Sequence, residues 1–555
     1  MSKLEIGVHN LDHLGIVAGI VDQLGIVEYI NDKLGIHPNQ KVSAGVIVKA
    51  MILNGLGFVS APLYMFEKFF VGIPTEHLLG AGVKPEYLND DRLGQVMDDI
   101  SEVGSSELFL GIALQGINIF QVEMNASHLD STSFHVHGKY TEKTIAEVET
   151  PTQTEVETEV EAEGIESIEI TYGYSRDHRP DLKQFMMNLI CVGDGDIPVW
   201  LEMANGNQSD KDKFAKILTE FKQQWDFDGL CVADAALYSA DNLQTMTGLK
   251  WLTRVPLTLK ESKEVIEREL ELEESNLKGY QIAELTSQYG GVEQRWFVIE
   301  SAERKSSDFK RIEKQTKDGK SKAEQRLKKF EREEFGCEAD ALVAAKKLSN
   351  EFLFYELTEI RVVEKQHYAR AGKPSATNIA VRTSYQVIAS IVRDEKSIDI
   401  QKKRAGRFIL ATNVLTLQEL SADDALKEYK AQQGTERGFR FLKDPLFFAS
   451  SIFLKTPKRI AVLGMIMALC LLVYNLAQRQ LRKALSEQGA TITNQLGKPT
   501  ATPTLRWVFQ CFMAVHLVTI EGVKQVINFT DERRHILKFF SSACQSYYLF
   551  LETDP

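Results

Sequence analysis

The chain has 555 residues, a net charge of −12, 44% hydrophobic residues and 26% charged residues. It is too long for one hydrophobic core, so about two to four domains of ordinary globular composition are expected. The net charge gives no sign of nucleic-acid binding, but it averages over domains, and a phosphate backbone responds to a local basic surface. The six cysteines lie scattered without a CxxC pair, which excludes a disulfide framework and a zinc site and fits a reducing cytosol.

Two segments bear on membrane association. The N-terminus has no basic region followed by an apolar core, so no signal peptide is predicted. Residues Ile460 to Tyr474 form an uncharged run of fifteen residues, shorter than the roughly 20 residues of a membrane span. Polar residues follow at once, so this run predicts a buried core helix and no membrane contact, with a membrane segment as the alternative.

Residues 1–117 show helix-like apolar spacing interrupted by glycine. One segment, NDDRLGQVMDDISEVG, begins with an Asn/Asp helix-cap signal. The pattern predicts an all-helical N-terminal domain. DNA-end binding is one candidate role, and a packing or protein-contact module is the other.

Residues 118–256 change to strand-like alternation. Two adjacent strands are predicted over 117–130 and 132–140, with Asp130 ending the first. A third strand or a hairpin follows over 185–206, then a helix over 209–225, a buried strand ending at Asp234, a helix over 239–248 and a strand over 251–256. Two carboxylates thus end strands of one sheet, where open α/β sheets place their sites.

Two insertions interrupt this pattern. Residues Glu142 to Glu169 are rich in Glu and Thr and predict an acidic, flexible surface segment. Residues 257–405 form a larger insertion domain, with strand-like runs around a basic helical segment, Arg304–Lys329, where eleven Lys/Arg stand against four acids. That stretch is either a solvated surface or a DNA contact. Residues 406–485 are expected to complete the core, followed by a helical C-terminal region, 486–555.

The segment Tyr429 to Pro445 is predicted to be one helix that Pro445 ends. Its charged and polar residues share one narrow arc at 100° per residue: Tyr429, Gln432, Glu436, Arg440 and Lys443. Gly434 and Gly438 oppose this helix by about 1 kcal/mol each. A lone carboxylate among cations suits a metal ion beside a phosphate chain, and a solvated, ion-paired helix face is the bland alternative.

Three carboxylates therefore stand out: Asp130, Asp234 and Glu436. Oxygen ligands hold hard divalent cations, and Mg²⁺ needs only one or two carboxylates when substrate phosphates complete its shell. Two such ions would activate an attacking hydroxyl and stabilise a leaving oxygen. The set is thus typical of nuclease and strand-transfer chemistry.

With these residues the chain resembles DDE transposases of bacterial insertion sequences, in the branch with a Y-x2-R-x3-E-x6-K signature. The resemblance covers roughly residues 120–480. Tyr429, Glu436 and Lys443 match, while Gln432 stands where the signature has Arg, a loss for which Arg437 or Arg440 could compensate. The resemblance implies an α/β, RNase H-like catalytic core with a large insertion domain. It also implies catalytic metal ligands at Asp130, Asp234 and Glu436, two Mg²⁺ or Mn²⁺ ions, and DNA-binding residues Tyr429, Gln432, Arg437, Arg440 and Lys443.

The implied function is a DNA transposase that binds terminal inverted repeats and catalyses metal-dependent cleavage and strand transfer. Its partners would be double-stranded DNA, as element ends and target, and a second copy of the chain in a homodimer assembled on DNA. Its place would be the bacterial cytoplasm, at the nucleoid. A catalytically weak or domesticated DNA-binding relative is one alternative, and a related metal-dependent nuclease is another that sequence does not separate from the first.

Other polar and aromatic residues allow two interpretations each. His135 and His137 alternate on a strand, as a metal pair or as a polar face. Arg176, His178 and Arg179 bind phosphate or brace a turn. Asn242 is expected to order the loop after Asp234. Trp296 stacks an extruded base or, as we expect, fills a core.

Overall fold

The computed structural model describes residues 6–58, 61–136, 168–174, 179–225, 227–368, 380–444, 454 and 456–550. The chain divides into two compact units, residues 1–252 with 428–555 (unit 1) and residues 253–427 (unit 2). The acidic segment predicted over 142–169 lies almost wholly outside the described residues, as does Pro445.

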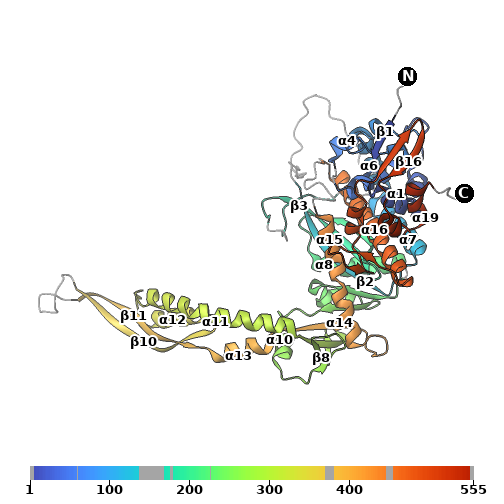
Figure 1. Ribbon diagram of the computed structural model, residues 1–555. Helices are drawn as coiled ribbons and strands as arrows, with labels where there is room; N and C mark the ends of the chain where they lie inside the picture. Colours follow the sequence, from blue (N-terminus) through green and yellow to red (C-terminus); the bar gives the residue numbers. More distant parts are fainter. Residues whose placement is uncertain are drawn as a thin grey trace. The chain divides into compact units, whose positions relative to one another are not determined.

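Helices dominate the N-terminal part of unit 1, as predicted (Figure 1). Ser43 and Asn89 cap α3 and α6 by accepting hydrogen bonds from backbone N–H groups three residues on. The helices are α1 (Leu14–Gln23), α2 (Ile26–Leu34), α3 (Ala44–Leu56), α4 (Phe66–Phe69), α5 (Thr75–Leu79), α6 (Asp90–Val103) and α7 (Ser105–Phe120).

This region is not all-helical, however. Strand β1 (Ile6–Asn10) pairs with β15 (His516–Ile520), which pairs with β16 (Val523–Ile527). The helical C-terminal prediction is incomplete for the same reason. Five-residue strands whose partner lies about 500 residues away leave no local signal to distinguish them from loops.

The sheet of unit 1 has the strand order β4-β3-β2-β5-β6. Its strands are β2 (Ala126–Val136), β3 (Lys183–Val192), β4 (Ile197–Ala204), β5 (Leu230–Ala233) and β6 (Lys250–Arg254), which crosses into unit 2. β2, β3 and β4 are antiparallel neighbours, and β5 runs parallel to β2. Helices α8 (Asp210–Trp225) and α9 (Ala240–Thr245) connect the later strands, so the predicted succession of helix, strand, helix and strand from residue 209 on is confirmed. The region predicted as a third strand or a hairpin over 185–206 is the hairpin of β3 and β4.

The bounds of the first two predicted strands were wrong. Residues 117–120 end helix α7, where Ile117 and Phe120 share its buried side, and β2 is one strand that runs through Asp130 to Val136. Over so few residues, strand-like and helix-like spacing of apolar residues cannot be distinguished. Tertiary packing therefore determines which of the two structures forms. Ser131, Thr132 and Ser133 are buried within this strand.

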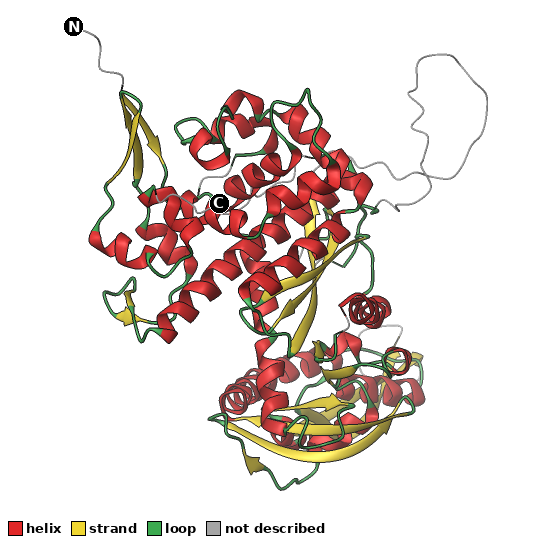
Figure 2. Ribbon diagram, turned by 90° about the vertical axis from the view of Figure 1, so that its right-hand side faces the viewer, coloured by secondary structure: helices red, strands yellow, loops and turns green. Residues whose placement is uncertain are grey.

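Helix α16 (Pro457–Glu487) is the centre of unit 1. By length and composition it could cross a membrane, as could the bent pairs α1–α2 and α6–α7 if each were one span, but 89% of its most apolar window is buried within the protein. The predicted core helix is therefore confirmed. Figure 2 shows the helices of unit 1 packed together beside the strands of its sheet.

The remaining elements of unit 1 are two helices just before α16, namely α14 and α15, and the C-terminal elements after it. Helix α14 (Ala422–Ala431) crosses from unit 2, and α15 (Gln433–Leu442) follows it. The C-terminal elements are β13 (Ile492–Thr493), β14 (Pro499–Thr500), α17 (Leu505–Cys511), β15, β16, α18 (Asp531–Leu537) and α19 (Ser542–Leu549).

Unit 2 contains a group of antiparallel strands and a long hairpin. The strands β12 (Arg407–Thr412), β9 (Val292–Ser301), β8 (Tyr280–Tyr289) and β7 (Glu273–Glu274) lie in that order. The hairpin β10 (Tyr355–Tyr368) and β11 (Ala380–Arg393) packs on α11 (Ala302–Phe330) and α12 (Glu338–Glu351) (Figure 1). Helices α10 (Lys260–Glu267) and α13 (Glu395–Arg404) complete the unit. The basic stretch is thus the exposed helix α11.

Candidate active site

Strand pairing brings Asp130 and Asp234 together. The parallel register of β2 and β5 pairs Leu129 with Ala233, so each Asp follows a paired residue on neighbouring strands about 4.8 Å apart. Residues at equivalent positions of parallel neighbours point to the same face of the sheet. The two carboxylates therefore lie side by side at this face, although Asp130 sits within β2 rather than at its end.

Backbone hydrogen bonds orient both carboxylates. Asp130 is buried, with 8% of its surface exposed, and its Oδ1 accepts from the N–H of Ser131 at 2.8 Å. The Oδ1 of Asp234 accepts from the N–H of Ala236 at 2.9 Å and caps the short turn after β5. Asn242 orders this loop as expected, since its side-chain amide donates to the backbone oxygen of Leu237 at 3.2 Å.

Helix α15 carries Glu436 onto the same face. The helix packs against β2 and β3, and Thr435 Oγ1 donates to the backbone oxygen of His128 at 3.4 Å. His128 lies two residues before Asp130, and strand alternation puts both side chains on one face. Glu436, next to Thr435 in the first turn of α15, is exposed. The first turn of α15, which carries Glu436, therefore lies against the strand that carries Asp130.

The predicted helix over 429–445 is interrupted. Gln432 separates α14 from α15, and α15 ends at Leu442, with Lys443 as its C-cap. Gln432 is buried, with 7% of its surface exposed, whereas Glu436 and Arg440 are exposed. The five-residue arc is therefore not one solvent-facing stripe, because the helix is not continuous through Gln432.

Asp196, which the sequence analysis did not identify, anchors α15. Its Oδ2 accepts from Arg437 Nη2 at 3.0 Å, and its backbone oxygen accepts from Asn475 of α16 at 2.6 Å. A Cβ on Gly434 would lie 1.8 Å from Asp196 Oδ1. The glycine that opposed a helix in the sequence is the position where α15 meets the β3–β4 turn. The only sequence signal was the turn-like run Gly193–Asp196.

A cation lies farther along the same face. Lys443 Nζ is 5.5 Å from the ring centre of Phe134, and Phe134 follows Asp130 by four residues, which keeps it on the same side of β2. Such a contact fits a cation–π interaction. Lys443 is therefore held beside the strand that carries Asp130.

His128 was also missed by sequence reasoning. Its side chain is 2% exposed, burial lowers its pKa to about 4, and its Nε2 lies 3.8 Å from Glu428 Oε2. The neighbouring Cys191 is paired with it across β2 and β3, and burial raises the pKa of that thiol. The available signal was the two-residue spacing between His128 and Asp130.

The structure distinguishes between the two interpretations for some of the other polar and aromatic residues. Trp296 is 1% exposed in β9 and donates its indole N–H to Gln294 at 3.1 Å, so the core interpretation is confirmed. Arg179 pairs with Asp181 two residues away, at 2.9 and 2.8 Å, and braces its turn. His135 is partly buried in β2. His137, Arg176 and His178 lie outside the described residues.

The donor set suits a hard divalent cation, since its three members are carboxylates on adjoining elements. Among the described residues, however, no three His, Cys, Asp or Glu side chains are arranged to enclose a metal ion by themselves. Mg²⁺ commonly takes one or two carboxylates together with waters and substrate phosphates. The residues therefore fit an open site that substrate completes.

Comparisons with known proteins define the class. Residues 124–476 match the family described as "Transposase DDE domain", and residues 6–114 match a "Domain of unknown function (DUF4277)". The first match spans more than half of the chain, so the protein belongs to the DDE transposase family. It is a DDE-type transposase, an enzyme of metal-dependent DNA cleavage and strand transfer.

None of the curated proteins matches the chain. Among solved structures, a piggyBac transposase synaptic complex with hairpin DNA is similar at 9% sequence identity and a TM-score of 0.38, covering 99% of this chain and 85% of that one. That TM-score is too low to establish a common fold.

Proposed function

We propose that this protein is an insertion-sequence transposase of the Y-R-E-K signature branch, with an RNase H-like catalytic core. It binds the terminal inverted repeats of its element, cleaves DNA at the ends and joins the 3′-hydroxyl ends to a target. The observation that carries the proposal is the register of β2 and β5, which sets Asp130 beside Asp234 under the helix of Glu436.

Each carboxylate has a role in this proposal. Asp130 and Asp234, oriented by backbone N–H groups, are the ligands fixed by the sheet, and the exposed Glu436 is the ligand supplied by α15. Two bound Mg²⁺ or Mn²⁺ ions would supply activation of the attacking oxygen and charge stabilisation of the leaving oxygen. In cleavage, water attacks a phosphorus and a 3′-hydroxyl leaves; in joining, that hydroxyl attacks a target phosphodiester and displaces another 3′-oxygen.

DNA contacts near the cleaved end are assigned to the α14–α15 segment. Lys443 and Arg440 would contact phosphates, and Tyr429 would donate to a backbone oxygen or stack. Arg437 is tied to Asp196 but remains 60% exposed, so it can still face a phosphate. Gln432 is the weakest member, because its side chain is buried. Pairing two element ends further implies a homodimer assembled on DNA, at the bacterial nucleoid.

The test is cleavage of a duplex that carries the flanking element end, with Mg²⁺, by wild type and Glu436→Gln. We expect nicking at the end by wild type and a loss of about 100-fold or more in the variant, because a ligand of the reacting centre is gone. DNA binding should persist. Glu487→Gln is the matched control, since Glu487 is an exposed glutamate at the end of α16, and it should cleave like wild type.

Other outcomes discriminate the alternatives. Equal cleavage by Glu436→Gln and wild type would remove Glu436 from the ligand set. Binding without cleavage by wild type would identify a catalytically weak relative. Cleavage without joining of the 3′ end to a target duplex would identify a metal-dependent nuclease.

A further inference from the structure

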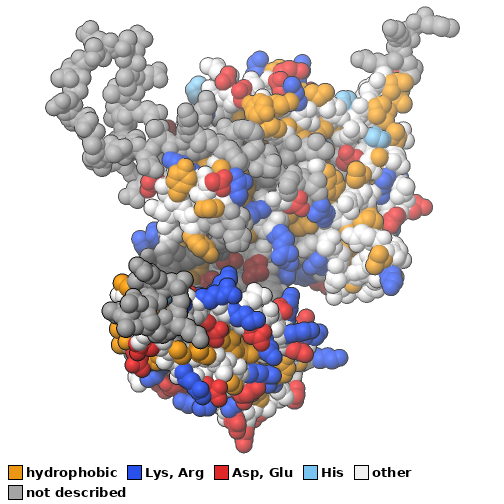
Figure 3. All heavy atoms as spheres, turned by 90° about the vertical axis from the view of Figure 1, so that its left-hand side faces the viewer, with side chains coloured by type: hydrophobic (Ala, Val, Ile, Leu, Met, Phe, Trp, Pro, Cys, Tyr) orange, Lys and Arg blue, Asp and Glu red, His pale blue; other side chains and the backbone are white. Residues whose placement is uncertain are grey.

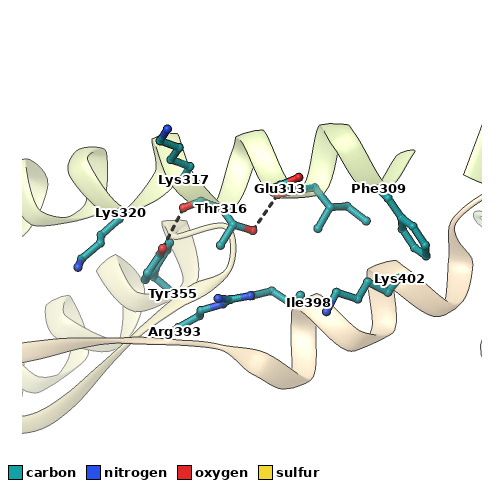
Figure 4. Close-up of a pocket in the computed structure, with 10 residues that line it drawn as sticks. Phe309, Glu313, Thr316, Lys317, Lys320, Tyr355, Arg393, Ile398 and Lys402 are labelled. Atoms are coloured by element: carbon teal, nitrogen blue, oxygen red, sulfur yellow. Dashed lines mark hydrogen bonds between the residues drawn. The ribbon is translucent and has the colours of Figure 1, made fainter. Parts of the chain in front are cut away.

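A cavity of about 600 Å³ lies in unit 2, between α11, the start of β10 and α13 (Figure 4). It involves none of the carboxylates of the candidate active site. Its lining consists of four apolar or aromatic side chains, one threonine, four cations and one acid: Phe309, Ile312, Glu313, Thr316, Lys317, Lys320, Tyr355, Arg393, Ile398 and Lys402.

The floor of the cavity is apolar and fixed. Ile312, Tyr355 and Ile398 are 6%, 8% and 0% exposed and belong to one buried cluster. The hydroxyl of Tyr355 donates to the backbone oxygen of Thr316 at 2.9 Å, which ties β10 to α11. This surface therefore does not depend on a ligand for its shape.

Four cations from three elements border the cavity, and Figure 4 shows the side chain of Lys317 directed away from the other lining residues. Lys317 and Lys320 of α11 are exposed, and within the described part of the chain they form no ion pair. Arg393 pairs with Glu395 at 3.0 Å and Lys402 with Asp399 at 3.7 Å, both as half-exposed surface pairs. Exposed pairs of this kind contribute little, so the rim retains an excess of positive charge.

The positive charge continues beyond the cavity. Helix α11 carries eleven Lys/Arg against four acids over Arg304–Lys329, and Figure 3 shows Lys and Arg side chains interspersed with Asp and Glu over the surface of unit 2. A small anion would be held by cations converging within the cavity. Exposed cations spread over three elements around the cavity instead fit a polyanion that contacts several of them at once.

We propose that this cavity and its cationic rim bind the sugar–phosphate backbone of duplex DNA. Phosphates contact Lys317, Lys320, Arg393 and Lys402, and the apolar side of a sugar lies against the exposed ring of Phe309. A free nucleotide shares this chemistry and is the alternative source of the phosphate. The inference rests on the proposed function, to which it adds a second DNA contact remote from the candidate metal ligands.

The test compares two variants with equal changes in charge. The pocket variant combines Lys317→Gln, Lys320→Gln, Arg393→Gln and Lys402→Gln. The control variant combines Lys310→Gln, Lys314→Gln, Lys322→Gln and Lys328→Gln, four exposed lysines of α11 outside the cavity. Circular dichroism establishes that both are folded. Binding to a duplex of arbitrary sequence is measured over a range of salt concentrations.

Each phosphate contact contributes about 0.9 to the slope of log affinity against log salt. The pocket variant should lose about 2 to 4 in slope and about tenfold or more in affinity at low salt, with a change less than half as large in the control. Equal losses in both variants, or a pocket variant that binds like wild type, would overturn the proposal. So would tight binding of a free deoxynucleoside monophosphate that the pocket variant loses while its duplex affinity stays unchanged.

A separate measurement of Mg²⁺-dependent nicking by wild type distinguishes failure of the cavity proposal from failure of the proposed catalytic function. If wild type nicks and the pocket variant binds duplex like wild type, the cavity proposal alone fails. If wild type binds duplex through the cavity but never nicks, the catalytic proposal fails and the cavity proposal stands.

Discussion

Gly434 and Gly438 let α15 approach its neighbours more closely than other residues would allow. A Cβ on Gly434 would lie 1.8 Å from Asp196 Oδ1, and one on Gly438 would lie 3.0 Å from Leu471 Cδ2 of α16. Real Cβ atoms do not sit at the first distance, so a side chain at 434 must displace Asp196 or the helix. Since Glu436 follows within the same turn, its placement depends on this contact.

Gly434→Ala should therefore reduce activity as well as stability. Forcing a methyl group against Asp196 breaks its pair with Arg437, and we expect a loss of about 1–2 kcal/mol in unfolding free energy. We also expect at least about a tenfold loss of Mg²⁺-dependent nicking, because a misplacement of about 1 Å at a reacting group has effects of this size.

Gly319→Ala is the control for that substitution. Gly319 is also within a helix, but its nearest neighbour to an added Cβ is Tyr355 Cε2 at 3.4 Å. There Ala should stabilise by about 0.5–1 kcal/mol and leave nicking unchanged. Thermal unfolding and the nicking assay check both variants; a Gly434→Ala protein as stable and active as wild type would show that Asp196 yields freely.

The sequence predicted Asp130 and Asp234 as site residues because each follows an apolar, strand-like run. Such strand ends can be recognised from local sequence alone. It could not reveal that Asp196 holds α15, because Asp196 and Arg437 are 241 residues apart. His128 and Thr435, 307 residues apart, pose the same problem. Contacts of this kind follow from tertiary structure, which no local pattern encodes.

At the scale of elements, long periodic segments were predictable and short ones were not. Helices α11 and α16 extend over 29 and 31 residues. Over such lengths, composition and periodicity are enough to predict a helix. Residues 117–120, by contrast, alternate like a strand but end helix α7, because Ile117 and Phe120 are buried on one side of it. Over a single turn, burial outweighs local preference.

The connection from β12 to α14 is held by one buried residue. Arg295 of β9 is 3% exposed, and its guanidinium forms two hydrogen bonds with Glu284, at 2.7 and 2.9 Å. Its Nη1 also donates to the backbone oxygen of Leu420 at 2.8 Å and of Val414 at 3.3 Å. One planar fork thus fixes both a strand and the loop that leads to α14.

Arg295→Lys should loosen this loop although the charge is kept. Lysine lacks the fork that bonds a carboxylate and backbone oxygens together, so we expect a loss of about 2 kcal/mol in unfolding free energy. Hydrogen exchange should rise over 413–420. As a control, Arg361→Lys at an exposed position of β10 should change neither the unfolding free energy nor the hydrogen exchange. Unaltered hydrogen exchange in Arg295→Lys would show that other contacts hold the loop in place.

At the scale of the whole molecule, the two chain ends build one body. Helix α1 packs against α19, and a Cβ on Gly19 would lie 2.4 Å from the Cα of Cys544. The region matched as a domain of unknown function therefore packs directly on C-terminal residues that lie outside both family matches. Removing those residues would expose the apolar side of α1, so the N-terminal region is not expected to be independent of them.

His13 lies where these ends meet. It is buried, with 3% of its surface exposed, its Nε2 donates to the backbone oxygen of Leu56 at 2.9 Å, and its ring stacks on Phe509 of α17 with 4.2 Å between the ring centres. Burial lowers its pKa from 6.5 to about 4, against a smaller opposing effect of the hydrogen bond to Leu56. The folded protein therefore keeps this imidazole neutral at pH values where the unfolded chain protonates it.

This difference makes stability depend on pH with a definite sign. Between pH 6.5 and about 4 the unfolded state binds the proton and the folded state does not, so stability is fully present above pH 6.5 and is lost as pH falls through this window. At about 1.4 kcal/mol per pKa unit, His13 contributes up to about 3 kcal/mol to the loss.

His13→Gln keeps a hydrogen-bond donor toward Leu56 but cannot titrate. The variant should be less stable than wild type at about pH 7, because the stacking on Phe509 is lost, and its Tm should fall less steeply than that of wild type from about pH 7 to about pH 5. His516→Gln is the matched control, since His516 is a partly exposed histidine in β15, and its pH profile should parallel wild type. Parallel profiles for His13→Gln and wild type would mean that the acid sensitivity of unit 1 originates elsewhere.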